Sequence, residues 1–143
     1  MEAIVTVGIS GSGKSTWASE FISGRPSWAV LERDQIRRSL LTPFSWARWD
    51  WRREDEVTRL WNLRVKEYAK EGVNLVVADT NLTHRGRIIG TLLDLGYDVT
   101  VKVFNTPVDV CIERDSRRPE GVRVGEAVIR RQYDKFRREF WPS

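Results

Sequence analysis

The stretch Gly8-Ile9-Ser10-Gly11-Ser12-Gly13-Lys14-Ser15 decides the fold of this chain. It fits the pattern G-x-x-x-x-G-K-[ST], in which glycines let successive backbone N–H groups turn inward around a polyphosphate. The apolar run before it, residues 3–7, reads as a short buried strand, and residues 16–22 after it have the pattern of a helix. Since a helix N-terminus carries positive partial charge, strand, loop and helix together predict a phosphate-binding loop.

Individual residues of this loop have distinct expected tasks. Lys14 brings a compact positive charge to the β and γ phosphates of a nucleotide, and the Ser15 hydroxyl is placed to ligate Mg²⁺. We therefore expect Mg²⁺ and ATP, or another nucleoside triphosphate, as cofactors. The alternative is a chance Gly/Ser-rich turn, but average residue frequencies give such a match in under about 1% of chains this long. The residues expected around the phosphates are Ser10, Gly11, Ser12, Gly13, Lys14, Ser15 and Thr16.

The composition is that of an ordinary globular domain. The 143 residues are 41% hydrophobic and 31% charged, and no apolar run approaches the ~20 residues that span a bilayer. A single cysteine, Cys111, excludes an internal disulfide framework, favours a reducing compartment, and is expected to serve packing. With no signal-peptide pattern at the start, we expect a cytoplasmic protein without a membrane partner. The formal net charge of +4 hints at a polyanionic partner.

Apolar runs and helical patterns alternate along the chain without a Pro/Gly-rich linker. Four strand–helix repeats of this kind predict one α/β domain over residues 1–143, with a mainly parallel four-stranded sheet flanked by helices. Together with the phosphate-binding loop, this is the P-loop NTPase fold of the nucleoside-kinase type. The expected strands are 3–7, 28–31, 73–79 and 97–104, and the expected helices are 16–22, 35–41, 54–71, 84–95, 107–115 and 125–140.

Two carboxylates follow predicted strands, at the sheet edge where open α/β sheets bind ligands. Asp34 comes just after the second strand and could accept a proton from an attacking hydroxyl, with Arg37 on a nearby phosphate. The alternative is that Asp34 caps the helix 35–41, and its position alone does not decide between the two. Asp79 ends the third strand and resembles the second acidic motif of P-loop proteins, which supports the Mg²⁺ shell.

Two arginine-rich segments connect these elements. Residues 114–121, with the sequence RDSRRPEG, predict a lid whose arginine neutralises charge on a transferring phosphoryl group. The alternative for them is a solvated basic loop. Residues 42–53 carry Trp46, Trp49 and Trp51 among arginines. Such a mixture can stack on single-stranded nucleic acid, or it can form a helical flap that fills the edge of the core, and the sequence leaves both open.

Four sequence blocks carry a resemblance to a known family. They are GISGSGKSTWASEFI (8–22), RDQIRRS (33–39), DTNL (79–82) and VFNTPVDVCIERDSRR (103–118). Together they resemble the 5′-hydroxyl polynucleotide kinase family, in particular the kinase domain of the phage T4 type. The blocks occur in the family's order and spacing across nearly the full length, and the second and third are not generic to P-loop proteins.

The resemblance implies catalytic and acceptor-binding roles. Asp34 would be the general base on the 5′-hydroxyl, and Lys14 and Arg118 would stabilise the charge of the transferring phosphoryl group. Arg37 would bind the first phosphodiester of the acceptor strand, which distinguishes a polynucleotide from a nucleoside. The nucleic-acid 5′ end would accordingly lie at Asp34, Arg37 and Thr80.

The resemblance also implies roles on the donor side. Lys14 and Ser15 would hold the donor phosphates and Mg²⁺, and Arg114 would line the donor side. Asp79 would support the site, either by contacting Mg²⁺ through water or by orienting an arginine, and the match leaves this open. The T4-type member assembles as a homo-oligomer, and whether this shorter chain keeps that interface is also left open.

One departure from the T4 type concerns the domain content. T4-type enzymes often carry a 3′-phosphatase domain with an acidic DxDxT signature, which residues 1–143 lack. We therefore expect a single kinase domain without a phosphatase domain, and this layout suggests a phage source and hence the host cytoplasm. The expected activity is transfer of the γ-phosphoryl of ATP, or another NTP, to the 5′-OH end of DNA or RNA, as in end-healing. The alternatives are a P-loop kinase of a small metabolite or antibiotic, and a non-catalytic nucleotide-gated nucleic-acid-binding module.

Overall fold

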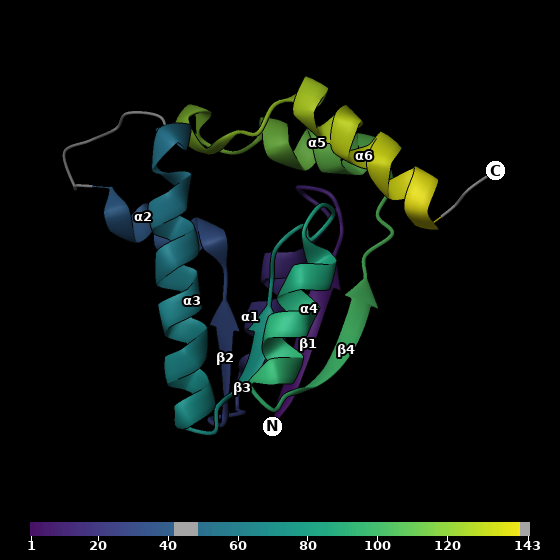
Figure 1. The fold of residues 1–143 in the computed structure, drawn as a ribbon. Helices are drawn as coiled ribbons and strands as arrows, with labels where there is room; N and C mark the ends of the chain where they lie inside the picture. Colours follow the sequence, from purple (N-terminus) through teal and green to yellow (C-terminus); the bar gives the residue numbers. More distant parts are fainter. Residues whose placement is uncertain (42–48, 141–143) are drawn as a thin grey trace.

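The strands of this protein form one parallel sheet. The computed structural model describes residues 1–41 and 49–140. Among these residues, four strands pair in the order β2-β3-β1-β4, and every pairing is parallel (Figure 1). The predicted α/β fold with a four-stranded sheet is thereby confirmed. The strands are β1 (Glu2–Val7), β2 (Trp28–Leu31), β3 (Asn74–Val77) and β4 (Asp98–Val103).

Each predicted helix occurs, with ends shifted by at most two residues. α1 begins at Lys14 because Gly13, directly before it, adopts a left-handed conformation (φ 99°). α2 begins at Arg33 after an N-cap at Glu32, so Asp34 lies inside the first turn, and the alternative that Asp34 caps this helix is wrong. The helices are α1 (Lys14–Ile22), α2 (Arg33–Leu40), α3 (Glu54–Lys70), α4 (Arg85–Asp94), α5 (Val108–Ser116) and α6 (Glu126–Phe140), with short 3-10 helices η1 (Trp51–Arg53) and η2 (Glu120–Val122).

Alternating side chains of β3 are buried on opposite faces of the sheet. Leu75 and Val77 belong to a core cluster that includes residues of α3 and α4, whereas Val76 packs with Ala18 of α1. The alternation follows from the two-residue period of an extended strand. All three β3 side chains are fully buried, and burial of each contributes about 1.5–3 kcal/mol. Helices therefore cover both faces of the sheet.

A third cluster attaches α5 and α6 to the carboxyl edge of the sheet. Val7 and Ile9 pack with Cys111 of α5 and with Ile129 and Phe136 of α6. Cys111 is thus buried in packing, as expected. Figure 1 shows these two helices lying across the ends of the strands, at the opposite end of the sheet from the N-terminus. None of the helices described has the length and apolar character that a membrane crossing requires.

Removing a fully buried side chain from β3 tests this packing. Leu75→Ala should lower the free energy of unfolding by about 3 kcal/mol, because it removes buried methyl groups and leaves a cavity against the helices. Leu63→Ala removes the same atoms from a position on α3 that is 46% exposed, and should cost under about 1 kcal/mol. Urea denaturation of both variants measures the difference, and equal losses would contradict the assigned core.

Candidate active site

The phosphate-binding loop is fixed in shape by the segments around it. Gly11 (φ 81°) and Gly13 (φ 99°) adopt left-handed conformations that residues with side chains disfavour. A Cβ on Gly11 would lie 2.7 Å from the carbonyl oxygen of Cys111, so this position has no room for a side chain. The Thr106 hydroxyl also donates a hydrogen bond to the carbonyl oxygen of Ser12 (2.8 Å). The segments that follow β4 therefore hold the loop on one side.

Lys14 is a buried cation within this loop. Its Nζ donates to the carbonyl oxygens of Gly8 (2.9 Å) and Ile9 (2.7 Å) and to the Ser12 hydroxyl (3.3 Å). These three partners are neutral, and burial lowers the pKa of the Lys14 ammonium to about 8. A desolvated cation among dipoles gains strongly from an incoming anion. The loop and its lysine therefore fit a polyphosphate.

Asp79 and Asp34 lie near this lysine, at the carboxyl edge of the sheet. Asp79 Oδ1 accepts a hydrogen bond from the backbone N–H of Arg33 (2.9 Å), which joins the end of β3 to the start of α2. Desolvation raises the pKa of Asp79 to about 6. The side chain of Asp34 is 68% exposed, and both carboxylates interact electrostatically with Lys14. The structure therefore brings these three predicted residues together.

Glu32 is a carboxylate at the site that the sequence analysis missed. It follows β2 directly, is buried, and accepts a hydrogen bond from the Ser15 hydroxyl; burial raises the pKa of Glu32 above its usual range. Because Ser15 is the expected Mg²⁺ ligand, Glu32 lies beside the expected metal position. Residues 1–41 and 49–140 contain no group of three His, Cys, Asp or Glu that could hold a metal. Mg²⁺ bound through phosphate oxygens, waters and one hydroxyl requires none.

Glu54, the first residue of α3, joins two side chains of α2 and one from the segment before η1. Its carboxylate accepts hydrogen bonds from Arg33 Nη2 (2.8 Å), Arg37 Nη2 (2.5 Å) and Trp49 Nε1 (3.0 Å). Burial alone would raise the pKa of Glu54, but the hydrogen bonds and charges of Arg37 and Arg33 lower it to about 2. Glu54 therefore holds two arginines of α2 in fixed positions.

Arg37 links this network to the predicted general base. Its Nη1 lies 2.5 Å from Asp34 Oδ1, one turn back along α2. The predicted phosphate-binding arginine and the predicted base are thus adjacent, and Glu54 orients the arginine from its other edge. The sequence analysis missed Glu54 because it is one of three acidic residues that open α3, where acidic residues commonly favour the helix dipole.

The two arginines assigned to the predicted lid and the donor side, Arg114 and Arg118, occupy different places. Arg114 of α5 donates from Nη1 to the carbonyl oxygen of Gly11 (3.0 Å), so it lies against the phosphate-binding loop. Arg118 is 39% exposed, its Nη1 lies 3.6 Å from Asp115 Oδ1, and its charge interacts with that of Lys14. Arg118 is therefore close enough to the loop for its charge to act there.

Buried Asp115 fixes the segment that carries these arginines. It accepts hydrogen bonds from the backbone N–H groups of Val124 (2.8 Å) and Gly125 (2.9 Å). These bonds join the end of α5 to the start of α6 and close the intervening residues into a loop. Of the predicted lid, residues 114–116 belong to α5, and residues 117–121 lie in the loop that contains η2.

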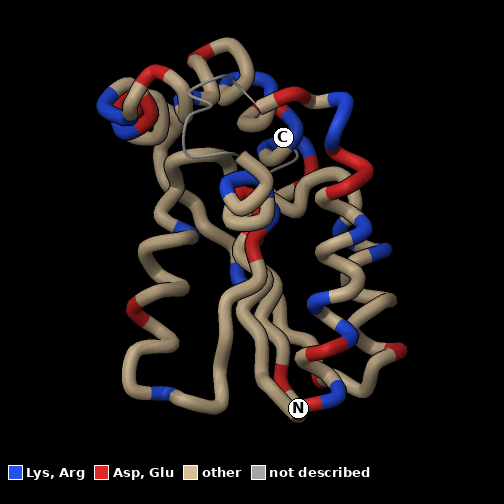
Figure 2. The backbone as a smooth tube through the Cα atoms, turned by 90° about the vertical axis from the view of Figure 1, so that its left-hand side faces the viewer, with Lys and Arg blue, Asp and Glu red and all other residues tan. Residues whose placement is uncertain are grey.

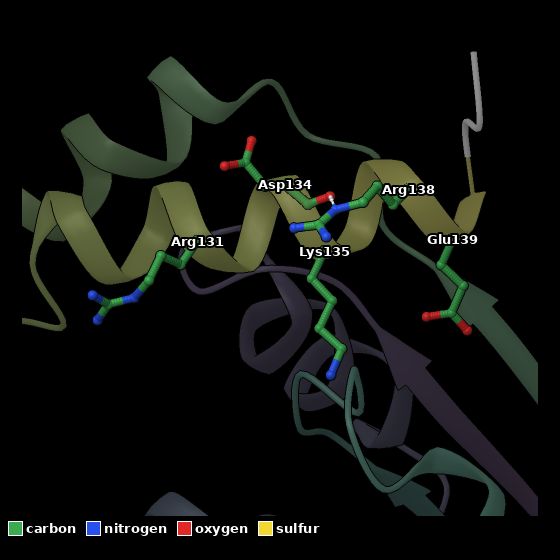
Figure 3. Close-up of a pocket in the computed structure, with 5 residues that line it drawn as sticks. All are labelled: Arg131, Asp134, Lys135, Arg138 and Glu139. Atoms are coloured by element: carbon green, nitrogen blue, oxygen red, sulfur yellow. Dashed lines mark hydrogen bonds between the residues drawn. The ribbon is translucent and has the colours of Figure 1, made fainter.

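α6 also contacts the phosphate-binding loop. Gln132 Oε1 accepts a hydrogen bond from the backbone N–H of Ser10 (2.8 Å), and Lys135 Nζ donates to the Thr83 hydroxyl (2.9 Å). Figure 3 shows Lys135 reaching down from α6 toward the loop that follows β3. This helix thereby joins the lid, the phosphate-binding loop and the end of β3. An open pocket on α6 is lined by Arg131, Asp134, Lys135, Arg138 and Glu139 (Figure 3).

The remaining predicted residues have mixed placements. The carbonyl oxygen of Thr80 accepts a hydrogen bond from the Gly8 N–H (3.2 Å), which joins the end of β3 to the phosphate-binding loop. Trp49 is half-buried and packs against the core, as the flap alternative expects, whereas Trp51 is 68% exposed. Trp46 lies outside the described residues. Figure 2 shows charged residues at the end of the molecule opposite the N-terminus, along the helices and around the N-terminus, but few along the strands.

The raised pKa of Asp79 predicts a pH-dependent cost to stability. The nucleotide-free folded state binds the Asp79 proton more tightly than the unfolded state, so wild-type stability falls as pH rises from about 4 through 6. Asp79→Asn should therefore be more stable than wild type by up to about 3 kcal/mol at pH 8 and by little at pH 4. Urea denaturation at both pH values measures this. Asp98→Asn, at an exposed position of β4, is the control, and a wild type that is the more stable protein at pH 8 would contradict the prediction.

The lowered pKa of Glu54 predicts the opposite pH trend. Its ionised form stabilises the fold above about pH 4.5, and this contribution is lost as pH falls toward 2. Glu54→Gln should cost roughly 2 kcal/mol at pH 7, because two charge-assisted hydrogen bonds are weakened, and progressively less below pH 4. Glu56→Gln, which affects a solvent-exposed pair with Arg53, should cost far less than Glu54→Gln at pH 7. A Glu54→Gln cost that is unchanged at pH 3 would disprove the assigned ion pairs.

Comparison with known sequences identifies the family. Residues 4–141 match the family model AAA_33, described as an AAA domain. A protein of Autographa californica nuclear polyhedrosis virus, assigned as a bifunctional polynucleotide kinase/RNA ligase, is 24% identical over 147 residues. That alignment covers 94% of this chain and 21% of the viral protein, so this chain spans about a fifth of its relative's length.

Solved structures share the fold of this chain. A chain of the Pnkp1/Rnl/Hen1 RNA repair complex matches with a TM-score of 0.77 at 25% identity, covering 95% of this chain and 44% of that one. The APS kinase CysC of Mycobacterium tuberculosis, in complex with AMPPNP and APS, matches with a TM-score of 0.58 at 25% identity, covering 81% and 69%. The match over residues 4–141 makes the chain a member of the AAA domain family AAA_33, and its parallel sheet and phosphate-binding loop give it a P-loop fold of the kinase type.

Proposed function

We propose that this chain is a kinase domain that transfers the γ-phosphoryl group of ATP, or another NTP, to the 5′-hydroxyl end of a DNA or RNA strand. The observation that carries the proposal is the Asp34–Arg37 pair, held by Glu54 beside the phosphate-binding loop. The viral relative and the RNA repair complex, whose names include a polynucleotide kinase and RNA repair, support the same acceptor.

On the acceptor side, Asp34 takes the proton of the 5′-hydroxyl as its oxygen forms a bond to the γ phosphorus. Its exposure leaves the carboxylate open to a substrate from solution, and Arg37 holds it in place. Arg37 binds the first phosphodiester of the acceptor, because Glu54 fixes its guanidinium and the guanidinium presents N–H groups next to Asp34, the general base. The 5′ end lies between these residues and Thr80.

On the donor side, the loop residues 10–16 hold the triphosphate, with Lys14 and Arg114 nearest its charge. Mg²⁺, when bound, neutralises charge on the phosphates, and Ser15 would hold it, with Asp79 acting through water or by orienting Arg33. The bond from the γ phosphorus to the β-γ bridging oxygen breaks as the new bond forms, and the nucleoside diphosphate leaves. Arg118 stabilises the charge that spreads over the phosphoryl oxygens.

A kinase of a small acceptor is the second candidate, because the structure of CysC, a kinase in complex with APS, shares the fold. Arg37 distinguishes the two functions. An acceptor without a phosphodiester next to its hydroxyl has no phosphate for Arg37 to bind. Loss of Arg37 would therefore leave the phosphorylation of such an acceptor largely intact.

Label transfer tests the proposed function directly. The protein is incubated with γ-labelled ATP, Mg²⁺ and matched oligonucleotides that end in 5′-OH or 5′-phosphate, in DNA and RNA versions. We expect label only on the 5′-OH strands. ATP binding or slow hydrolysis without transfer to any oligonucleotide would reject the proposal in favour of a small acceptor.

Substitutions at the residues with proposed catalytic and acceptor-binding roles give a sharper test. Asp34→Ala should lower kcat by at least about 100-fold, because proton removal is lost, and Arg118→Ala should likewise abolish measurable transfer. Arg37→Ala should mainly raise the KM for the oligonucleotide, whereas Arg38→Ala, at an exposed position of the same helix, should change neither constant more than about twofold. A folded Asp34→Ala protein with near-normal turnover would refute the mechanism.

A further inference from the structure

Trp51 is an exposed aromatic side chain next to the acceptor side of the site. It is the first residue of η1, and its 68% exposure is the highest among the large exposed hydrophobic residues of the described chain. The guanidinium carbon of Arg37 lies 5.1 Å from the centre of the Trp51 ring. The cation that contacts Asp34 therefore also contacts this indole.

Two neighbouring contacts hold the backbone around Trp51. The Asp50 carboxylate accepts a hydrogen bond from the Arg52 N–H (3.0 Å), and the Asp50 carbonyl oxygen accepts one from the Arg53 N–H (2.9 Å). η1 then runs directly into α3, whose first residue is Glu54. Trp51 and Arg37 are consequently tied to the same carboxylate, one through the chain and the other through hydrogen bonds.

Trp49, two residues earlier, is a tryptophan that packs against the core, and it can be compared with Trp51. It is partly buried against the core, and its indole N–H donates to Glu54 Oε2 (3.0 Å). Trp51 has neither core packing of this kind nor comparable burial. Arg37 lies over the ring, and most of the remaining indole surface is exposed to solvent beside the residues proposed to bind the acceptor strand.

We propose that Trp51 is a stacking platform for one of the two bases that flank the acceptor phosphodiester bound by Arg37. This inference rests on the proposed function and adds a specificity-determining residue to it. Every base offers a flat face, so stacking on an indole strengthens binding without selecting a sequence. A base in a duplex is already stacked and paired, so the platform favours 5′ ends that are single-stranded or readily unpaired.

The test compares acceptors that differ only in the presence of a base. Wild type and Trp51→Ala are assayed at saturating ATP with a single-stranded 5′-OH oligonucleotide and with versions that carry an abasic site at the first or second nucleotide. With the intact strand, Trp51→Ala should raise KM by about 10-fold or more and change kcat little. At the stacked position the abasic acceptor should raise the wild-type KM by a similar factor, and Trp51→Ala should then add no further loss.

Two further variants separate stacking from bulk and charge. Trp51→Phe keeps an aromatic face and should recover most of the affinity, whereas Trp51→Leu keeps an apolar side chain and should not. Arg52→Ala removes a side chain that is 90% exposed and pairs with Asp50, and should change KM less than about threefold. Because Trp51 is exposed, all Trp51 variants should unfold at nearly the wild-type urea concentration.

The outcomes separate this inference from the function on which it rests. Absence of wild-type transfer to every oligonucleotide would reject the proposed function and the platform with it. Normal wild-type transfer with an unchanged Trp51→Ala KM would reject the platform alone. The same holds if the losses from Trp51→Ala and from each abasic site multiply, because independent effects would mean that no base rests on the indole.

Discussion

All four strands of the described sheet run in the same direction, and the candidate site depends on that constraint. Parallel pairing of β1 with β3, and of β3 with β2, brings three strand ends to one edge. The phosphate-binding loop, Asp79 and Glu32 follow those three ends, although they are far apart in the sequence. The hydrogen bonds from the Gly8 N–H to the Thr80 carbonyl, and from the Arg33 N–H to Asp79, then join neighbouring ends. The phosphate-binding loop, Asp79 and Glu32 are thus positioned by strand pairing and by hydrogen bonds between neighbouring strand ends.

Charged groups at this edge are buried without full compensation. Lys14 is surrounded by neutral acceptors, and the pKa values of Lys14 and Asp79 shift in opposite directions, each toward the neutral form. Burial of this kind destabilises the protein in the absence of a ligand, and a bound polyphosphate with its metal ion would supply the missing charges. Without a ligand, the buried charges of this site lower the stability of the protein, and we expect ligand binding to restore that stability. Glu54 shows the contrasting case, in which a carboxylate with two arginine partners is strongly favoured in its ionised form.

The sequence was sufficient to predict the features that depend on local pattern. The phosphate-binding loop is contiguous, and Asp34 and Asp79 lie at strand ends that apolar runs reveal, so these positions could be named in advance. The contacts of Glu54 could not be predicted, because its partners Arg33 and Arg37 lie 21 and 17 residues away. Three acidic residues begin α3, and nothing in the sequence distinguishes Glu54 from the other two. The bond between Gln132 and the Ser10 N–H spans 122 residues and depends on how α6 packs, which periodicity does not encode. α2 begins at Arg33 and not at the expected residue 35, because Glu32 and not Asp34 is the extended residue before the helix.

Asp115 has a consequence for how the chain tolerates changes in length. Its buried carboxylate binds the backbone at Val124 and Gly125, so the two ends of the arginine-bearing loop are joined independently of what lies between them. The free energy of closing a flexible loop changes only slowly with its length. Insertions or deletions between residues 119 and 122 would therefore leave α5 and α6 in register with the phosphate-binding loop. We therefore expect this stretch to accept inserted residues while the packing of α5 against α6 is kept.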